Sequence, residues 1–353
     1  NERIRLEGRE ISRQDFARLA TRVRAEAETL LDQGRLETLP TFFEHLTAIA
    51  LLAFSEKQVR LAILETGLGG RLDATTAARA SIAAITPIAL DHQEFLGQTL
   101  SQIAAEKAAI IRPGMTAIIS PQPPAALEAI LKHCADSGVQ PRLDECAALI
   151  HGAEEMGRVR ATFRTRHDVY ENVLLALRGR HQVINASVTI QLAEALREHG
   201  FRIAREDIIS GLETARHAGR LEWLAGSPAI LFDGAHNVAG AHALREFLSE
   251  FVHAPLTLVF GAMRDKELDQ IAAELFPLAR RLILTAPANP RAAAPEALAL
   301  AVPNGFDSSR IQLAANTGEA LGLARRETPP DGVICITGSL YLVGEAQSIL
   351  NSV

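Results

Sequence analysis

The stretch "RLAILETGLGGRLDATT", residues 60–76, combines a short apolar run, a glutamate and a glycine-rich segment. Its first six residues predict a buried strand, and the glycines predict a loop directly after it. The loop has no lysine followed by Ser or Thr, the arrangement that phosphate-binding loops need. This segment therefore indicates a strand that ends at Glu65, without a phosphate cradle beside it.

Further apolar runs and helices alternate with this strand. The runs at 81–88 and 116–120 are rich in Ile and Ala, as central parallel strands are. Residues 41–57, 99–110 and 123–138 have helical apolar spacing with stop signals at their ends. Such alternation predicts an α/β fold with a doubly wound sheet.

The middle of the chain has a different pattern. Residues 140–178 alternate polar and apolar side chains, which predicts antiparallel strands, and two helices follow before a boundary at 217–228. Strand and helix patterns then alternate again up to a strand at 332–338. We therefore expect two doubly wound domains, at 1–222 and 223–353, the second smaller and Rossmann-like.

Composition excludes several classes of protein. The 353 residues carry a net charge of −6 with 48% hydrophobic residues, and no basic run or spanning apolar run occurs. This balance argues against binding to nucleic acid or to a membrane surface. Three unpaired cysteines fit a reducing cytoplasm. No G-x-G-x-x-G follows a strand, which disfavours a nicotinamide-dependent oxidoreductase.

Candidate site residues lie where the predicted strands end, since ligands bind beyond the carboxyl ends of parallel strands. Glu65 ends one strand, and Asp91 and His92 follow another. A carboxylate at such a place suits a hard cation such as Mg²⁺. Glu65 could equally cap the amides of the glycine loop, and both readings stay open.

Lys107 is one of only four lysines and has alanine and isoleucine neighbours. On a helix surface it would snorkel to solvent. If it is desolvated, its pKa falls and the neutral amine can react with carbon dioxide to form a carbamate. Such a carbamate is an anion that can bind a metal or position a phosphate.

A second polar group lies at a predicted strand-to-helix turn. The motif "FDGAHN" places Asp233 and His236 there, beside a helix amino end that favours anions. Asp233 could also be a plain helix cap and His236 a surface residue. Upstream, Asn185 opens a long helix, and Arg220 lies in the predicted hinge, where its fork can grip phosphate.

Six motifs together resemble the bacterial folylpolyglutamate synthase/dihydrofolate synthase family of the Mur ligase superfamily. They run in family order along the whole chain: "ETGLGGRLDATT", "ALDHQEFLG", "AAEKAAIIRPG", "HQVINA", "AGRLEW" and "FDGAHN". The resemblance implies a Mur-ligase-like central ATPase domain, incomplete at its amino end, and a C-terminal ligase domain. A cell-wall Mur ligase is the nearest alternative.

The resemblance also implies an activity. ATP phosphorylates a carboxylate of dihydropteroate or folate, and L-glutamate attacks the acyl phosphate to form an amide. Family magnesium ligands correspond to Glu65 and His92, and the carbamylated lysine corresponds to Lys107. Domain closure would protect the acyl phosphate from water. We expect a monomer that binds only these small molecules.

The remaining site residues are carried over from the family in the same way. Contacts to ATP correspond to Asn185, Arg220 and Asp233, and Asp233 is also expected near the chemistry together with Lys107 and His236. The pterin-binding segments correspond to Thr41, Phe42, Phe43, Glu44, Leu72, Asp73 and Ala74. The glycines of the 67–70 segment would then serve backbone approach to ligand.

One family feature is missing from these 353 residues. The family carries a G-x-x-G-K-[ST] phosphate loop near its amino terminus, and this sequence, which begins with Asn1, has none. We therefore expect the chain to be a fragment with little ligase activity by itself. A non-catalytic remnant that only binds ligand or oligomerises is the alternative from a different functional class.

Overall fold

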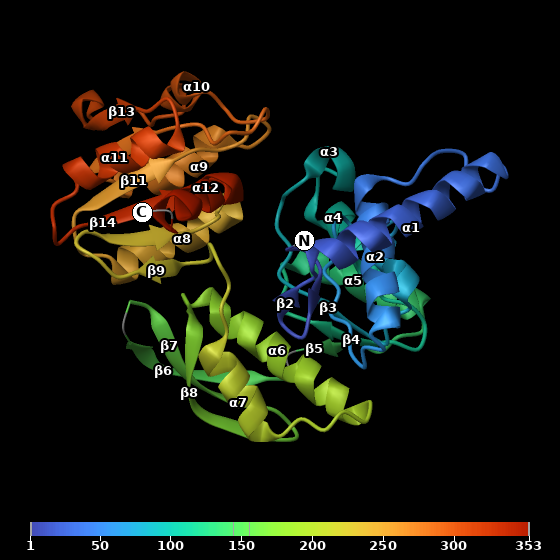
Figure 1. The fold of residues 1–353 in the computed structure, drawn as a ribbon. Helices are drawn as coiled ribbons and strands as arrows, with labels where there is room; N and C mark the ends of the chain where they lie inside the picture. Colours follow the sequence, from blue (N-terminus) through green and yellow to red (C-terminus); the bar gives the residue numbers. More distant parts are fainter. Residues whose placement is uncertain (1, 144, 155, 352–353) are drawn as a thin grey trace. The chain divides into compact units, whose positions relative to one another are not determined.

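Helices and strands alternate through the computed structural model, which describes residues 2–143, 145–154 and 156–351 (Figure 1). The predicted α/β class is confirmed. The chain divides into two compact units. The first comprises Asn1–Ile88, His92–Ala117 and Pro123–Pro141, and the second comprises Ala89–Asp91, Ile118–Gln122 and Arg142–Val353.

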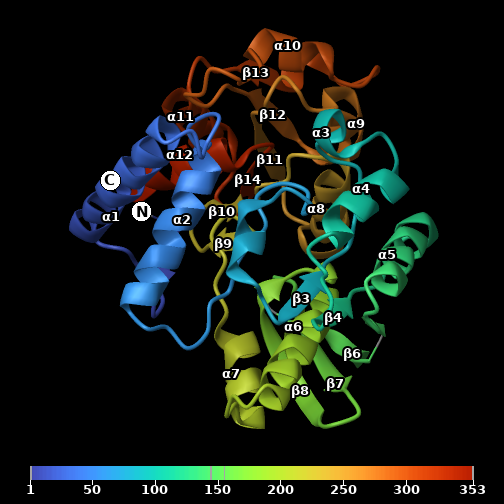
Figure 2. The ribbon, with the colours of Figure 1, turned by 90° about the vertical axis from the view of Figure 1, so that its right-hand side faces the viewer.

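The first unit begins with a helical pair that Figure 2 shows side by side. The two helices pack through buried apolar residues that include Leu19, Leu46 and Ile49. The first of them lies outside the elements predicted from sequence. The elements up to residue 78 are β1 (Arg5–Leu6), β2 (Arg9–Glu10), α1 (Arg13–Asp32), α2 (Phe42–Glu56) and the 3-10 helix η1 (Ala74–Ala78).

The strand predicted at 60–65 is wrong. These residues form no strand, and the side chain of Ile63 is 87% exposed. An apolar run becomes a strand only when its backbone groups pair with a neighbour. No strand in the described part of the chain pairs with these residues. The apolar pattern alone therefore misassigned this segment.

The strands predicted at 81–88 and 116–120 and the helices predicted at 99–110 and 123–138 are confirmed. Two strands form where the apolar runs at 81–88 and 116–120 predict them, and they belong to a three-stranded sheet of order β3-β4-β5. The helices α4 and α5 pack on each other. The elements are β3 (Ile82–Ile85), α3 (Gln93–Leu96), α4 (Leu100–Ala108), β4 (Thr116–Ile119), α5 (Pro124–Asp136) and β5 (Arg142–Leu143).

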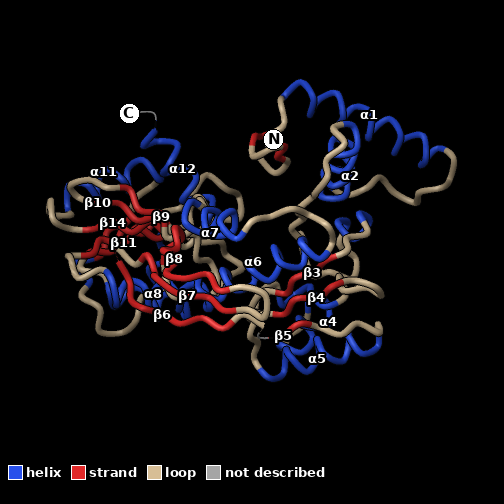
Figure 3. The backbone as a smooth tube through the Cα atoms, turned by 90° about the horizontal axis from the view of Figure 1, so that it is seen from below, coloured by secondary structure: helices blue, strands red, loops and turns tan. Residues whose placement is uncertain are grey.

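The predicted antiparallel strands form an antiparallel sheet in the second unit, drawn in red in Figure 3. One face is buried against two helices through residues such as Phe163, Tyr170 and Ile190. This layer consists of β6 (Ala147–Glu154), β7 (Arg158–Arg164), β8 (Val169–Arg178), α6 (His181–Glu198) and α7 (Arg205–Thr214).

The rest of the second unit is a six-stranded sheet of order β13-β12-β11-β14-β10-β9, parallel except for β9. Helices α8, α9 and α10 bury one face, and α11 and α12 bury the other. In sheets of this kind, ligands bind beyond the carboxyl ends of the parallel strands. Its strands are β9 (Glu222–Leu224), β10 (Ala229–Phe232), β11 (Leu256–Phe260), β12 (Arg281–Leu284), β13 (Ile311–Leu313) and β14 (Val333–Thr337). Its helices are α8 (Val238–Phe251), α9 (Leu268–Leu275), η2 (Phe276–Leu278), α10 (Pro295–Leu300), η3 (Ser308–Arg310), α11 (Thr317–Glu327) and α12 (Leu340–Asn351).

Across the described residues, no helix combines the length and the apolar character that crossing a membrane requires.

Candidate functional site

Asp73 holds the glycine loop, residues 66–73, in place. Its carboxylate is 6% exposed and accepts hydrogen bonds from the backbone N–H of Gly67 at 2.8 Å and of Leu68 at 3.1 Å. The N–H of Thr75 donates to the other carboxylate oxygen at 2.9 Å. The role of capping the loop amides, considered for Glu65, therefore belongs to Asp73.

The glycines of this loop lie against protein atoms. A Cβ on Gly67 would fall 2.6 Å from the ring of Phe43, and one on Gly70 would fall 2.7 Å from the carbonyl oxygen of Glu106 and 2.9 Å from that of Lys107. Only glycine allows such an approach. These glycines therefore allow close packing against α2 and α4. They had been expected to allow the close approach of a ligand.

This packing brings together the two segments predicted to bind a pterin. Phe43 touches Gly67, and Asp73 holds the N–H of Gly67. The residues around Phe43 form a capping box, in which the Glu44 carboxylate accepts from the Thr41 N–H at 2.6 Å. Two segments about thirty residues apart in the sequence therefore form one surface.

The apolar side chains of these segments differ in exposure. Phe42 and Leu72 are 72% and 81% exposed, whereas Phe43 is half-buried. Ala74 begins η1, which Asp73 caps. Phe42 and Leu72 are therefore exposed to solvent.

Lys107 lies half-buried near the end of α4, beside Gly70. The neighbouring Glu106 accepts a hydrogen bond from Arg71 Nε at 3.0 Å, which ties the loop to the helix. The packing of the glycine loop on α4 therefore fixes the position of the Lys107 backbone.

Glu65 and His92 both belong to the first unit. Glu65 is exposed, and His92 has a left-handed backbone (φ 51°) directly before α3. No group of three or more His, Cys, Asp or Glu side chains gathers around a possible metal position within the described ranges.

In the second unit, Asp233 joins the hinge to the turn before α8. Its carboxylate, 8% exposed, accepts from the N–H of Leu221 and of Ala235, both at 2.9 Å. Burial raises the pKa of Asp233, and the positive charge of Arg220 opposes that shift. Arg220 therefore lies close enough to act on this carboxylate.

Arg220 and the start of α6 are also near each other. Partial desolvation lowers the pKa of His181, and the charge of Arg220 lowers it further. His181 Nε2 lies 3.1 Å from Gln182 Nε2, and the Asn185 amide donates to Gln182 Oε1 at 3.0 Å. Asn185, Arg220 and Asp233 are thus connected through a set of neighbouring polar groups.

Sequence reasoning missed the role of Asp91 as the centre of a polar cluster. Its carboxylate accepts from Lys266 Nζ at 3.0 Å and from Asn237 Nδ2 at 2.9 Å, and His236 Nε2 lies 3.7 Å away. All four residues belong to the second unit. Asn237 also caps α8 through the N–H of Gly240. The position of Asp91 directly before His92 was the available signal.

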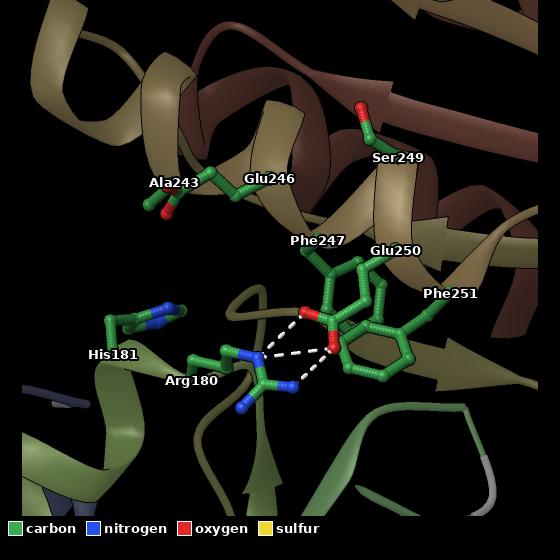
Figure 4. Close-up of a pocket in the computed structure, with 8 residues that line it drawn as sticks. All are labelled: Arg180, His181, Ala243, Glu246, Phe247, Ser249, Glu250 and Phe251. Carbon is green, nitrogen blue, oxygen red and sulfur yellow. Dashed lines mark hydrogen bonds and ion pairs between the residues drawn. The ribbon is translucent and has the colours of Figure 1, made fainter.

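A cavity of about 340 Å³ lies between the start of α6 and α8 (Figure 4). Arg180 faces Glu250 across it, with Nε–Oε2 and Nη2–Oε1 distances of 2.8 and 2.6 Å. The rings of Phe247 and Phe251 lie 5.3 Å apart beside this ion pair. His181 also lines the cavity, so the space adjoins the polar groups of α6.

Comparison with known proteins explains this arrangement. Residues 15–193 match the Mur ligase middle domain, and residues 219–340 match the Mur ligase glutamate ligase domain. The dihydrofolate synthase/folylpolyglutamate synthase of Mycobacterium tuberculosis is 33% identical over 378 residues, which cover 99% of this chain and 77% of that protein. The chain belongs to the folylpolyglutamate synthase/dihydrofolate synthase family of Mur ligases. The predicted resemblance is confirmed.

Two further relatives agree with this family. The Bacillus subtilis dihydrofolate synthase/folylpolyglutamate synthase is 32% identical, across 99% of this chain and 81% of its own length. The structure of M. tuberculosis folylpolyglutamate synthase complexed with ADP and AMPPCP has a TM-score of 0.88 at 31% identity. It covers 97% of this chain and 80% of that one. The family's fold therefore extends over nearly all of the described residues.

Proposed function

We propose that this protein is an ATP-dependent ligase that adds L-glutamate to dihydropteroate, to folates, or to both. The observation that carries this proposal is family membership over nearly the whole chain, from the glycine loop to the glutamate ligase domain. Amide formation from a carboxylate needs activation, and phosphoryl transfer from ATP supplies it. We also propose that the protein acts in the cytoplasm as a monomer.

The nucleotide is proposed to bind through Asn185, Arg220 and Asp233. A guanidinium fork suits phosphate oxygens, and a carboxylate suits ribose hydroxyls or an amine. The connection of these residues through His181 and the hinge supports this assignment. Since Asp233 also anchors the hinge backbone at Leu221, it can link nucleotide binding to the position of that segment.

Mg²⁺ is proposed to bind at Glu65 and His92. Asp73, rather than Glu65, accepts the hydrogen bonds of the loop amides, so the Glu65 carboxylate can coordinate the ion. When bound, the ion neutralises charge on the transferred phosphate. Lys107, half-buried on α4, is the proposed site of a carbamate.

The folate substrate is proposed to bind over residues 41–44 and 72–74. The exposed side chains of Phe42 and Leu72 offer an apolar surface to a pterin ring. The polar groups of Thr41, Glu44 and Asp73 form hydrogen bonds that cap a helix or hold the glycine loop. These residues therefore fix the shape of the surface.

The chemistry proceeds in two displacements. A substrate carboxylate oxygen attacks the γ-phosphorus of ATP, and ADP leaves. The amine of glutamate then attacks the acyl carbon, and phosphate leaves with that oxygen. His236 is proposed to lie near the second step, where its Nδ1 is held by the Gly234 carbonyl at 2.8 Å and its Nε2 faces Asp91.

Growth rescue tests this function. The whole gene is introduced into bacteria that lack dihydrofolate synthase and folylpolyglutamate synthase, and folate glutamate chains are measured by mass spectrometry. Rescue with glutamylated folates supports the proposal, and chain length separates first addition from extension. The absence of rescue from soluble protein, or activity on a nucleotide-linked cell-wall precursor, would contradict it.

A further inference from the structure

Three side chains at the start of α6 form a hydrogen-bonded series. His181 Nε2 contacts Gln182 Nε2 at 3.1 Å, and Gln182 Oε1 accepts from Asn185 Nδ2 at 3.0 Å. Gln182 is buried at 8% exposure, between a pocket-lining histidine and a half-buried asparagine. In this arrangement the Gln182 carboxamide directs its nitrogen at His181 and its oxygen at Asn185.

The chemistry of the carboxamide sets the direction of this series. The nitrogen of Gln182 can only donate, so Nε2 of His181 must accept. His181 is then neutral and carries its proton on Nδ1. The same orientation leaves Gln182 Oε1 as the acceptor for the amide N–H of Asn185. The lowered pKa of His181 agrees with a neutral ring.

The carboxamide of Asn185 therefore has one defined orientation. Its Nδ2 is committed to Gln182, and its Oδ1 accepts no hydrogen bond from any residue that the structure describes. We propose that Gln182 is a positioning residue that fixes Asn185 with its carbonyl oxygen toward a donor group of the bound nucleotide. This inference rests on the proposed function, in which Asn185 contacts ATP. The donor is the exocyclic amine of adenine or a ribose hydroxyl.

Binding measurements with two substitutions of Gln182 test this role. Calorimetry without folate or glutamate compares MgATP with MgITP, which has a carbonyl in place of the amine, and with Mg-2′-deoxy-ATP. Wild type should bind one of these analogues more weakly than ATP. Gln182→Leu should reduce that preference by about threefold to tenfold, the effect of one ordinary hydrogen bond. Gln182→Glu keeps the acceptor for Asn185 and should keep the preference.

Gln191 supplies the matched control. It lies on the same helix, is 5% exposed, and donates to the Ser187 carbonyl at 3.2 Å, away from Asn185. Gln191→Leu should leave the nucleotide preference unchanged even if it lowers stability. In an Asn185→Ala background, Gln182→Leu should have no further effect on preference. An unchanged preference in Gln182→Leu alone would overturn the proposal.

A measurement without nucleotide separates this inference from the proposed function. ¹⁵N NMR of labelled histidine reports which His181 nitrogen carries the proton, with the signal assigned by a His181→Gln variant. Wild type should carry it on Nδ1, and Gln182→Glu should move it to Nε2, because a carboxylate only accepts. A proton on Nε2 in wild type would refute the proposed orientation. Failure of the wild-type protein, expressed from its whole gene, to bind any nucleotide would instead refute the proposed function.

Discussion

Replacing Gly70 with alanine tests how the glycine loop packs on α4. A new Cβ would lie 2.7 Å from the Glu106 carbonyl oxygen, 2.8 Å from Ile110 Cγ2 and 2.9 Å from the Lys107 carbonyl oxygen. Two of these three atoms are helix backbone, which cannot move aside as a side chain end can. Overpacking of this kind costs about 1–3 kcal/mol. We expect Gly70→Ala to destabilise the contact by that amount.

Hydrogen–deuterium exchange of the α4 amides measures this effect where it occurs. A loss of 1–2 kcal/mol corresponds to exchange faster by roughly 5- to 30-fold. Gly211→Ala is the matched control, because nothing lies within 4 Å of its Cβ position and it lies within α7. That change should stabilise α7 by about 0.5–1 kcal/mol. Unchanged α4 exchange in Gly70→Ala would refute the packing argument.

Three other predictions follow from buried groups. Asp73→Ala removes a carboxylate that accepts hydrogen bonds from the loop amides. The urea midpoint of unfolding should therefore fall by an amount equivalent to about 2–4 kcal/mol. An unchanged midpoint would contradict this role. Because burial raises the pKa of Asp233 in the folded state, its contribution to stability is greatest below its unfolded pKa and falls as pH rises through the native value. Asp233→Asn should therefore gain stability relative to wild type as the pH rises above the unfolded pKa of this carboxyl group, while nucleotide binding weakens. A pH-independent difference would argue against it. Burial raises the pKa of Cys134 and Cys335, and that of Cys146 to about 11, so iodoacetamide at pH 8 should label none in folded protein and all three in urea.

Periodic patterns of apolar residues predicted most of the helices and strands, because these patterns indicate which side chains are buried in the fold. The strand at 60–65 shows the limit, since an apolar run records a preference for burial and cannot specify the strand that would pair with it. The helix α1 was missed for the opposite reason. Its sequence is rich in Arg and Glu, and only Leu19 and Ala27 are buried in it.

The candidate site shows the same division. Motifs indicated Asn185, Asp233 and the glycine loop, because residue type and chain position carry that information. Contacts between distant segments were out of reach, such as the ion pair of Asp91 with Lys266 or the packing of Gly70 on α4. The sequence shows which groups are present, and the three-dimensional arrangement decides which neighbour each one bonds.

The most direct test of the proposed function follows one oxygen atom. The protein, expressed from its whole gene, is incubated with ATP, L-glutamate and a folate substrate whose reacting carboxylate carries ¹⁸O, and the released phosphate is analysed by mass spectrometry. Activation of the carboxylate by ATP predicts that one labelled oxygen appears in phosphate, together with ADP and a product longer by one glutamate. Unlabelled phosphate, or AMP and pyrophosphate in place of ADP, would contradict the proposed reaction.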